Sequence, residues 1–367
     1  MNRRKIIGGW LLISVAAAVL ALGLPLLGAF LGGRDVSGVL AFPPRPPALA
    51  LPGFSPAWFG FGVAVEGVVY AVLGWLLWRC RRRPSGVRPF PRWGWAALLW
   101  LMVWWALAWT RPAWLGPLRD WTFTPLWLGY VAVVDALCVR WRGWSLATRR
   151  PAFLLGLFPL SAVFWWYFEY LNRFVGNWRY LGVEHLSPWR YFWHATLPFS
   201  TVLPAVVSTV VLLGAFFGPP RRLMPLRPAH PRRWGWGGLV LAGLALVGVG
   251  AWPQWCFPLV WVAPLGLIVS LQVLSGRRSY FHPLARGHWE VVAVPALAGL
   301  VCGFFWELWN VWSLPKWVYV VPWVGAFKLF EMPLLGYAGY LPFGLECIVV
   351  AVRLRRLPLM PDSPAGE

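Results

Sequence analysis

Strongly apolar segments of about twenty residues follow one another along almost the whole chain, and this feature constrains the fold most. A helix of that length covers the hydrocarbon core of a bilayer, which is about 30 Å thick. Lipid offers the backbone no hydrogen-bond partners, and the segments lack the alternation of barrel strands, so we expect helices. The segments lie near residues 6–32, 57–78, 93–112, 121–140, 152–174, 195–217, 235–252, 257–275, 290–312 and 334–352. The sequence therefore predicts an all-α, polytopic transmembrane helical bundle of about ten helices.

Composition supports a membrane environment and argues against a nucleic-acid partner. Of the 367 residues, 59% are hydrophobic and 12% are charged, whereas roughly 25% of residues are charged in soluble domains. The net charge of +21 comes from short basic runs between apolar segments, such as residues 79–83, and not from one basic face. Runs of this kind orient membrane proteins. They favour a multi-pass protein of the inner (cytoplasmic) cell membrane with both termini in the cytoplasm.

The first apolar segment has two interpretations. It follows Arg3, Arg4 and Lys5, and a basic start before an apolar run is typical of a signal peptide as well as of a membrane anchor. Its length favours the anchor. Cleavage would remove one helix and leave the order of the others unchanged.

Several short motifs occur twice, in the same order, in the later part of the chain. The matched stretches are 92–95 with 233–236, 123–127 with 257–261, 166–172 with 304–310, 178–180 with 317–319, and 197–199 with 341–343. Five ordered matches indicate a tandem duplication of four helices. An even number of helices makes the two copies parallel, related by an axis along the membrane normal. The predicted parts are 1–91 (two leading helices and a basic cytoplasmic loop), 92–232 (first unit), 233–353 (second unit) and 354–367 (cytoplasmic tail).

Acidic residues inside the apolar segments are the strongest candidates for chemistry, because a charge at the centre of a bilayer costs about 2.5–3.5 kcal/mol. Glu169 and Glu307 occupy equivalent positions in the two units, and Asn172 and Asn310 follow each of them by three residues, on the same helical face. A carboxyl group removed from water favours its protonated form, so both glutamates are candidate catalytic proton donors. The other embedded acids are Glu66, Asp135 and Glu346, and Asp135 is expected to pair locally with Arg140 or Arg142.

The duplication predicts an aromatic pocket with these carboxyl groups at its head, between the two units. The candidate ligand-binding residues are Asn172, Asn310, Trp166, Trp178, Tyr180, Trp306, Trp317 and Tyr319. Two other interpretations remain open. Each glutamate can instead be a structural hydrogen-bond partner of its own asparagine or loop, and the Trp-x-Tyr elements can belong to the aromatic belt at the membrane interface.

Metal and cofactor sites are not predicted. The five cysteines form no Cys-x-x-Cys pair, and Glu184, His185 and His194 lack the spacing of metal ligands. Phosphate-binding loops and nucleophile motifs are not visible either.

The intramembrane glutamate followed by Trp-x-Tyr in each of two tandem units resembles the integral-membrane lycopene (carotenoid) cyclase type, over residues 166–180 and 304–319. That resemblance implies a long isoprenoid as substrate, with Glu169 and Glu307 as proton donors. The chain departs from the family in having four helices in each unit and in lacking a Pro-x-Glu-Glu element.

Three functions follow as hypotheses. The first is binding of, or acid catalysis on, an apolar isoprenoid or lipid taken from the membrane. The second is a proton-coupled transporter with the same acids as relay groups. The third is a structural or assembly partner of a membrane complex. The sequence does not indicate the oligomeric state.

Overall fold

The computed structural model describes residues 3–44, 49, 51–84, 86–220 and 223–354, and within these ranges it is mainly helical. The predicted tail, apart from Leu354, lies outside the described residues. The α-helices are α1 (Arg3–Leu31), α2 (Pro56–Cys80), α3 (Arg92–Thr110), α4 (Phe123–Arg142), α5 (Leu146–Arg149), α6 (Pro151–Val175), α7 (Pro188–Phe199), α8 (Val202–Leu213), α9 (Pro231–Ala251), α10 (Pro253–Cys256), α11 (Ala263–Leu274), α12 (Glu290–Asn310) and α13 (Tyr340–Ala351). The 3-10 helices are η1 (Ser37–Leu40), η2 (Ala113–Trp121), η3 (Phe257–Trp261), η4 (His282–Arg286) and η5 (Leu334–Gly339).

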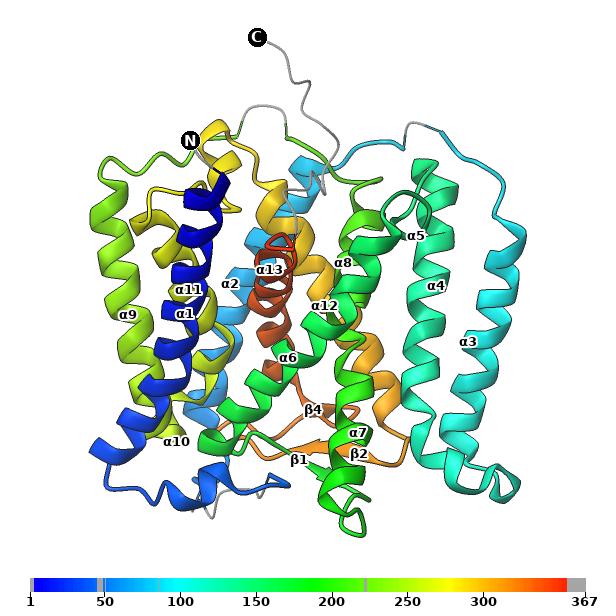
Figure 1. Ribbon diagram of the computed structural model, residues 1–367, viewed down its shortest axis with the longest axis horizontal. Coiled ribbons are helices and arrows are strands. Elements are labelled where there is room, and N and C mark those ends of the chain that lie inside the picture. Colours follow the sequence, from blue (N-terminus) through cyan, green and yellow to red (C-terminus); the bar gives the residue numbers. More distant parts are fainter. Residues whose placement is uncertain (1–2, 45–48, 50, 85, 221–222, 355–367) are drawn as a thin grey trace.

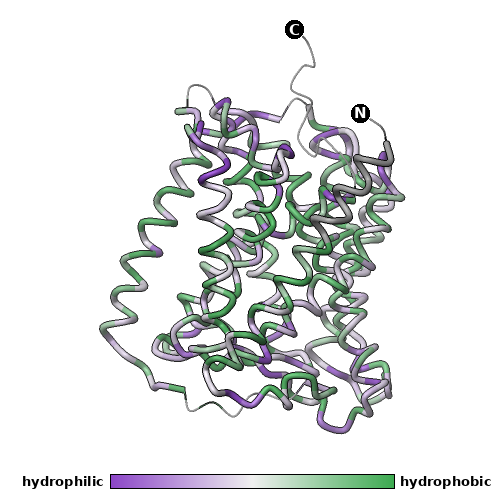
Figure 2. Tube along the Cα trace, turned by 60° about the vertical axis from the view of Figure 1, so that its left-hand side comes forward, coloured by the Kyte–Doolittle hydropathy of each residue, from purple (hydrophilic) through white to green (hydrophobic). Residues whose placement is uncertain are grey.

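Eight helical stretches in the described residues are long and apolar enough to cross a membrane. They are Pro56–Cys80, Arg92–Thr110, Phe123–Arg142, Pro151–Val175, Pro188–Leu213, Pro231–Ala251, Glu290–Asn310 and Leu334–Ala351. The coarse prediction of a helical, multi-pass membrane protein is therefore confirmed. Figure 2 agrees, because hydrophobic residues predominate along the helices and hydrophilic stretches gather toward the two ends of the bundle.

The segment predicted as one helix near 257–275 is broken. Pro253–Trp261 and Ala263–Leu274 meet at an angle of 55° and make a ninth span only if they are counted together. Pro258 and Pro264 explain the break, because proline lacks the N–H that an uninterrupted helix needs. In α1, the described apolar stretch is Val15–Leu31. The predicted count of about ten helices stays a prediction.

The helices of the bundle form three groups (Figure 1). Helices α3 and α4 pack together on one side, and α9, α11 and α1 pack together on the other, with α6, α8, α12 and α13 between them. Helix α2 packs on α12 and η5 and exposes most of its apolar side chains. Helix α1 begins and α13 ends at the same end of the bundle (Figure 1). The assignment of that end to the cytoplasm stays a prediction from the basic residues.

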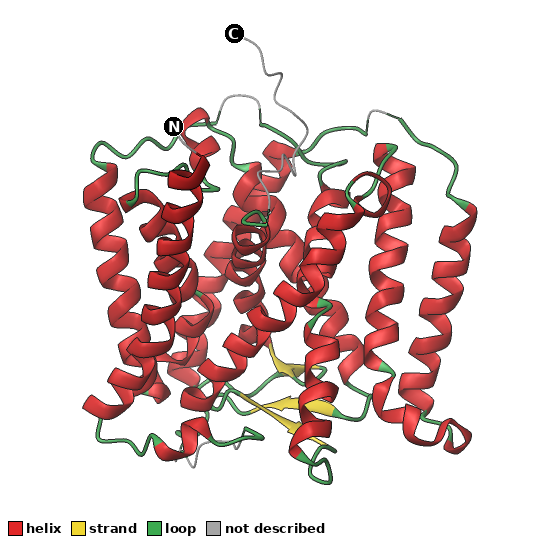
Figure 3. Ribbon diagram, in the orientation of Figure 1, coloured by secondary structure: helices red, strands yellow, loops and turns green. Residues whose placement is uncertain are grey.

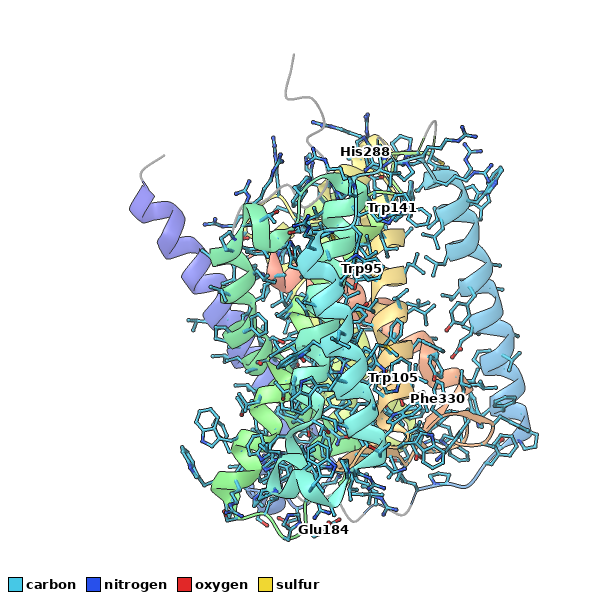
Figure 4. The ribbon with its side chains drawn as sticks, turned by 90° about the vertical axis from the view of Figure 1, so that its right-hand side faces the viewer. Trp95, Trp105, Trp141, Glu184, His288 and Phe330 are labelled. Carbon is cyan, nitrogen blue, oxygen red and sulfur yellow. The ribbon has the colours of Figure 1, made fainter. Side chains whose placement is uncertain are left out.

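Four short strands lie at the opposite end of the bundle (Figure 3). They are β1 (Trp178–Leu181), β2 (Lys316–Tyr319), β3 (Lys328–Leu329) and β4 (Met332–Pro333). Strand β1 follows soon after α6 ends at Val175, because the next residue, Gly176, has a φ of 64° that turns the chain out of the helix. Figure 4 places Glu184 at this end and His288 and Trp141 at the other, with Trp95 and Trp105 of α3 at intermediate depths.

Candidate functional site

Glu169 of α6 binds three aromatic side chains through one carboxylate oxygen. Its Oε1 accepts hydrogen bonds from the Tyr180 hydroxyl at 2.6 Å, from Trp178 Nε1 at 3.0 Å and from Trp165 Nε1 at 3.1 Å. The glutamate is 2% exposed. Helix α6 therefore holds the side chains of the strand that follows it.

Glu307 of α12 makes the equivalent arrangement in the second predicted unit. Its Oε1 accepts from the Tyr340 hydroxyl at 2.6 Å, from the Tyr319 hydroxyl at 2.7 Å and from Trp317 Nε1 at 3.4 Å. The glutamate is 0% exposed. Trp178 and Tyr180 are thus matched by Trp317 and Tyr319, as the sequence alignment of the two units predicts.

The two asparagines fix the backbone of the same strands. Asn172 donates to the Trp178 carbonyl at 2.7 Å and accepts from the Trp178 N–H at 3.2 Å. Asn310 donates to the Trp317 carbonyl at 2.7 Å and accepts from the Trp317 N–H at 2.9 Å. The side-chain amide thus makes the two hydrogen bonds to the strand backbone that a neighbouring strand would otherwise make. Both asparagines thus hold the strands in place through the same pair of bonds.

Strands β1 and β2 join the two glutamate sites. They pair antiparallel, with Trp178 opposite Tyr319 and Tyr180 opposite Trp317. Each unit therefore places its tryptophan beside the tyrosine of the other. Side chains of directly opposed residues lie about 4.5–5.5 Å apart at Cβ, so the pairing brings both aromatic clusters into one site.

The second matched stretch of each predicted unit, 123–127 and 257–261, contributes an aromatic ring that packs on the other unit. The Trp261 ring stacks on Phe168 at 5.2 Å and on Trp178 at 5.7 Å between centroids. In the opposite direction, Phe123 contacts the Trp317 ring at 5.4 Å. Aromatic side chains thus contribute to the contacts between the two predicted units.

A pocket lies where these clusters meet, with an empty space of about 1120 Å³ that includes its open mouth. Its wall combines aromatic residues of both units, and Asp120 and His194 add polar groups. The aromatic lining residues are Phe123, Trp165, Trp178, Tyr180, Tyr191, Phe199, Trp261, Trp306, Trp317, Tyr319 and Tyr340. The structure thus places five predicted ligand-binding residues in the wall: Trp178, Tyr180, Trp306, Trp317 and Tyr319.

The remaining predicted site residues are not among those that line the pocket. Glu169, Glu307, Asn172 and Asn310 lie behind the aromatic wall and bind it. Trp166 is directed to α7, where its Nε1 donates to Thr196 Oγ1 at 3.0 Å and its ring stacks on Phe192. The glutamates therefore reach the pocket only through tyrosine and tryptophan side chains.

The tyrosines of the strands hold their protons. Burial in the protein and the adjacent glutamates raise the pKa of Tyr180 and of Tyr319 well above the ordinary value. Each hydroxyl donates to a carboxylate oxygen. The wall of the pocket thus carries phenol groups that remain neutral at physiological pH.

Tyr340 is a site residue that the sequence motifs did not indicate. In the alignment of the units, Tyr340 corresponds to Thr196, and Gly303 corresponds to Trp165. A Cβ on Gly303 would lie 2.3 Å from the Tyr340 ring, so the glycine makes room for the tyrosine. In the first unit, Trp165 fills the equivalent space and supplies a hydrogen bond to Glu169. The paired exchange of large and small residues at these two aligned positions is the signal that would have revealed Tyr340.

Asp135 does not form the predicted ion pair among the described residues. It is 2% exposed, and its Oδ1 accepts from the Ala147 N–H at 3.3 Å. Arg142 instead donates to the Val211 carbonyl at 2.7 Å. The turn that follows α4 brings backbone N–H groups to the acid, so the loop and not a cation binds Asp135 Oδ1, whereas Oδ2 is buried without a partner among the described residues.

The remaining embedded acids lie apart from the pocket lining. Glu346 of α13 is 1% exposed, and Glu66 of α2 is partly buried. In the described part of the chain, no three His, Cys, Asp or Glu side chains are placed to hold a metal ion.

Comparisons with protein-family models, with curated proteins and with solved structures find no match to this chain.

Proposed function

We propose that this integral membrane protein binds an isoprenoid or a similarly apolar lipid in the pocket between the two predicted units. The observation that carries the proposal is the wall itself, in which aromatic rings from both predicted units surround the empty space and several of them donate hydrogen bonds to Glu169 or Glu307. Pockets for apolar ligands are lined mainly by aromatic and aliphatic side chains, with a few polar groups that fix orientation.

The tandem duplication is part of this proposal. It is supported by the two matching glutamate sites, by the two asparagine contacts and by the antiparallel pairing of β1 with β2. A ligand between two related units meets similar aromatic groups on both sides, which suits a long and nearly symmetric molecule such as an isoprenoid chain.

We further propose that the tyrosine and glutamate pairs act as acids on the ligand. A protonated glutamate would supply the proton through its tyrosine: the phenol proton would pass to a carbon of a double bond as the glutamate proton passes to the phenol oxygen, so the tyrosine stays neutral. The electron pair of the double bond forms the new C–H bond and leaves a carbocation, and loss of a proton from a neighbouring carbon to the ionised glutamate, by the same route, would restore the acid. The resemblance to lycopene cyclases belongs to this proposal and suggests an acyclic polyene as substrate.

Labelling with a diazirine derivative of geranylgeraniol tests the binding. We expect ultraviolet light to attach the probe to peptides that contain Trp178 and Trp317. Ala195→Trp should reduce labelling by roughly tenfold, because the indole occupies space in a pocket that Ala195 lines. Ala96→Trp on the exposed face of α3 is the matched control and should be labelled normally. Equal labelling of wild type and Ala195→Trp would contradict the binding site.

The acid role is tested in a host that accumulates an acyclic polyene. Glu169→Gln and Glu307→Gln keep the size of the side chain but remove the acid. We expect chromatography of pigment and lipid extracts to show a new product with the wild type and much less with Glu307→Gln. If both variants, at normal protein levels, form as much product as the wild type, acid catalysis is wrong and only binding remains.

The transporter and assembly hypotheses stay predictions. Uptake that collapses with the proton gradient would indicate the first, and a stoichiometric partner in mild detergent would indicate the second.

A further inference from the structure

The two glutamate sites are alike in their strands but differ in the charges around them. Arg173, four residues after Glu169 on the same face of α6, lies within electrostatic range of that glutamate. Its guanidinium also binds the carbonyls of Val39 and Ala41, which hold it beside the end of α6. Glu169 therefore has a fixed cation as a neighbour.

Glu307 lacks a cation at the equivalent position, because Val311 corresponds to Arg173 in the alignment of the units. Its strongest charged neighbour is the anion Glu331. Glu331 is itself paired with Lys316, which also donates to the Val311 carbonyl. The Glu331 and Lys316 pair is neutral as a whole and leaves a charge on Glu307 uncompensated.

The hydrogen bonds of Glu307 fit a neutral carboxylic acid. Both phenols and the indole donate to Oε1, whereas Oε2 has no partner among the described residues and is buried. The three donors of Glu169 also bind its Oε1, but its Oε2 is not among the buried atoms without a partner. In a carboxylic acid, Oε1 is the carbonyl oxygen that accepts, and Oε2 carries the proton. An ionised Glu307 would leave an unpaired anionic oxygen in the interior, which is far more costly than an unpaired hydroxyl.

The donors differ as well. Glu169 is bound by two indoles and one phenol, and Glu307 by two phenols and one indole. Phenols exchange protons with a carboxyl group far more readily than indoles do, because the indole N–H is donor only. Tyr340 and the space made by Gly303 therefore give the second site two proton carriers.

We infer that Glu307 is the protonated acid of the pocket and that Glu169 is an ionised anchor balanced by Arg173. This inference deepens the proposed function, because it names the glutamate that supplies the proton. The groups that face Glu307 are Tyr319 and Trp317 from β2, Tyr340 from α13, Tyr337 from η5, and the paired Glu331 and Lys316. The protonation states can be measured without any ligand. The assignment of protons to the two glutamates can therefore be wrong while ligand binding is right, and ligand binding can be wrong while the assignment is right.

Infrared spectra of the purified full chain test it through the carbonyl stretch that only protonated carboxyl groups show. We expect Glu307→Gln to remove part of this band and Glu169→Gln to leave it unchanged. We expect Arg173→Gln to add intensity, because Glu169 then loses its cation and takes up a proton. Loss of intensity with Glu169→Gln, or no loss with Glu307→Gln, would overturn the inference.

A milder pair of variants covers the case in which Glu307→Gln does not fold. Tyr340→Phe removes one hydrogen bond to the Glu307 carbonyl oxygen, so one component of the band should move to higher frequency. Tyr180→Phe removes the equivalent bond to Glu169 and should leave every component in place, because an ionised carboxylate does not contribute to the band. The opposite pattern, or an unchanged band in both variants, would show that Glu307 is not the protonated group.

Discussion

Gly344→Ala should lower the free energy of unfolding by about 3 kcal/mol, at the upper end of the cost of overpacking a rigid core. A Cβ at this position would lie 2.0 Å from the Pro295 carbonyl oxygen and 3.0 Å from the Gly299 Cα. All of these contacts are with backbone, so no side chain can rotate away. Helices α12 and α13 would have to separate where small residues let them cross closely.

A thiol-reactive dye measures this effect in detergent, because Cys302 and Cys347 are 0% exposed and react only on unfolding. Gly74→Ala is the matched control. It lies in α2, and its Cβ would have no atom within 4 Å. Alanine has the higher helix propensity, so the control should melt at the wild-type temperature or slightly above it. If Gly344→Ala and the wild type had the same melting temperature, the helices α12 and α13 would have to cross with more space between them than the structure shows.

Loss of this crossing should also disturb the pocket. The Tyr340 carbonyl lies against Gly299, since a Cβ there would be 2.2 Å from that oxygen. The same tyrosine donates its hydroxyl to Glu307. The helix crossing thus positions a residue of the pocket wall.

Asn310→Ala should cost about 2–4 kcal/mol, because it leaves the N–H and the carbonyl of Trp317 without their partners. Asn310 is 0% exposed, so water cannot replace the lost bonds easily. Strand β2 should then loosen and withdraw Tyr319 and Trp317 from Glu307. Hydrogen exchange of the amides in 316–320 should become faster, and labelling by the isoprenoid probe should fall.

Asn177→Ala is the control for this variant. Asn177 is similarly buried, but its side chain makes one long hydrogen bond, of 3.5 Å, to the Phe257 carbonyl, and its Oδ1 has no partner in the described structure. We expect a small change in stability and normal exchange in β2. If Asn177→Ala loosened β2 as much as Asn310→Ala, the specific role of the asparagine after each glutamate would be wrong.

The sequence was sufficient for features that depend on local composition and order. The apolar stretches predicted the membrane-spanning helices, because burying a backbone in lipid requires a helix of a given length. The ordered matches align Glu169 with Glu307, Asn172 with Asn310, and Trp178 with Trp317, and in the structure each pair makes corresponding hydrogen bonds. The duplication itself stays a prediction.

Only the tertiary structure decided which of these residues face the pocket. Glu169 and Glu307 lie behind the wall because their hydrogen bonds hold aromatic side chains between them and the empty space. Tyr340 reaches Glu307 from a helix 33 residues further along the chain, through space that Gly303 leaves free. Such placements depend on which helices cross and how closely they approach. The approach of two helices is set by packing between segments that are distant in the sequence, so the residue pattern within one segment does not predict it.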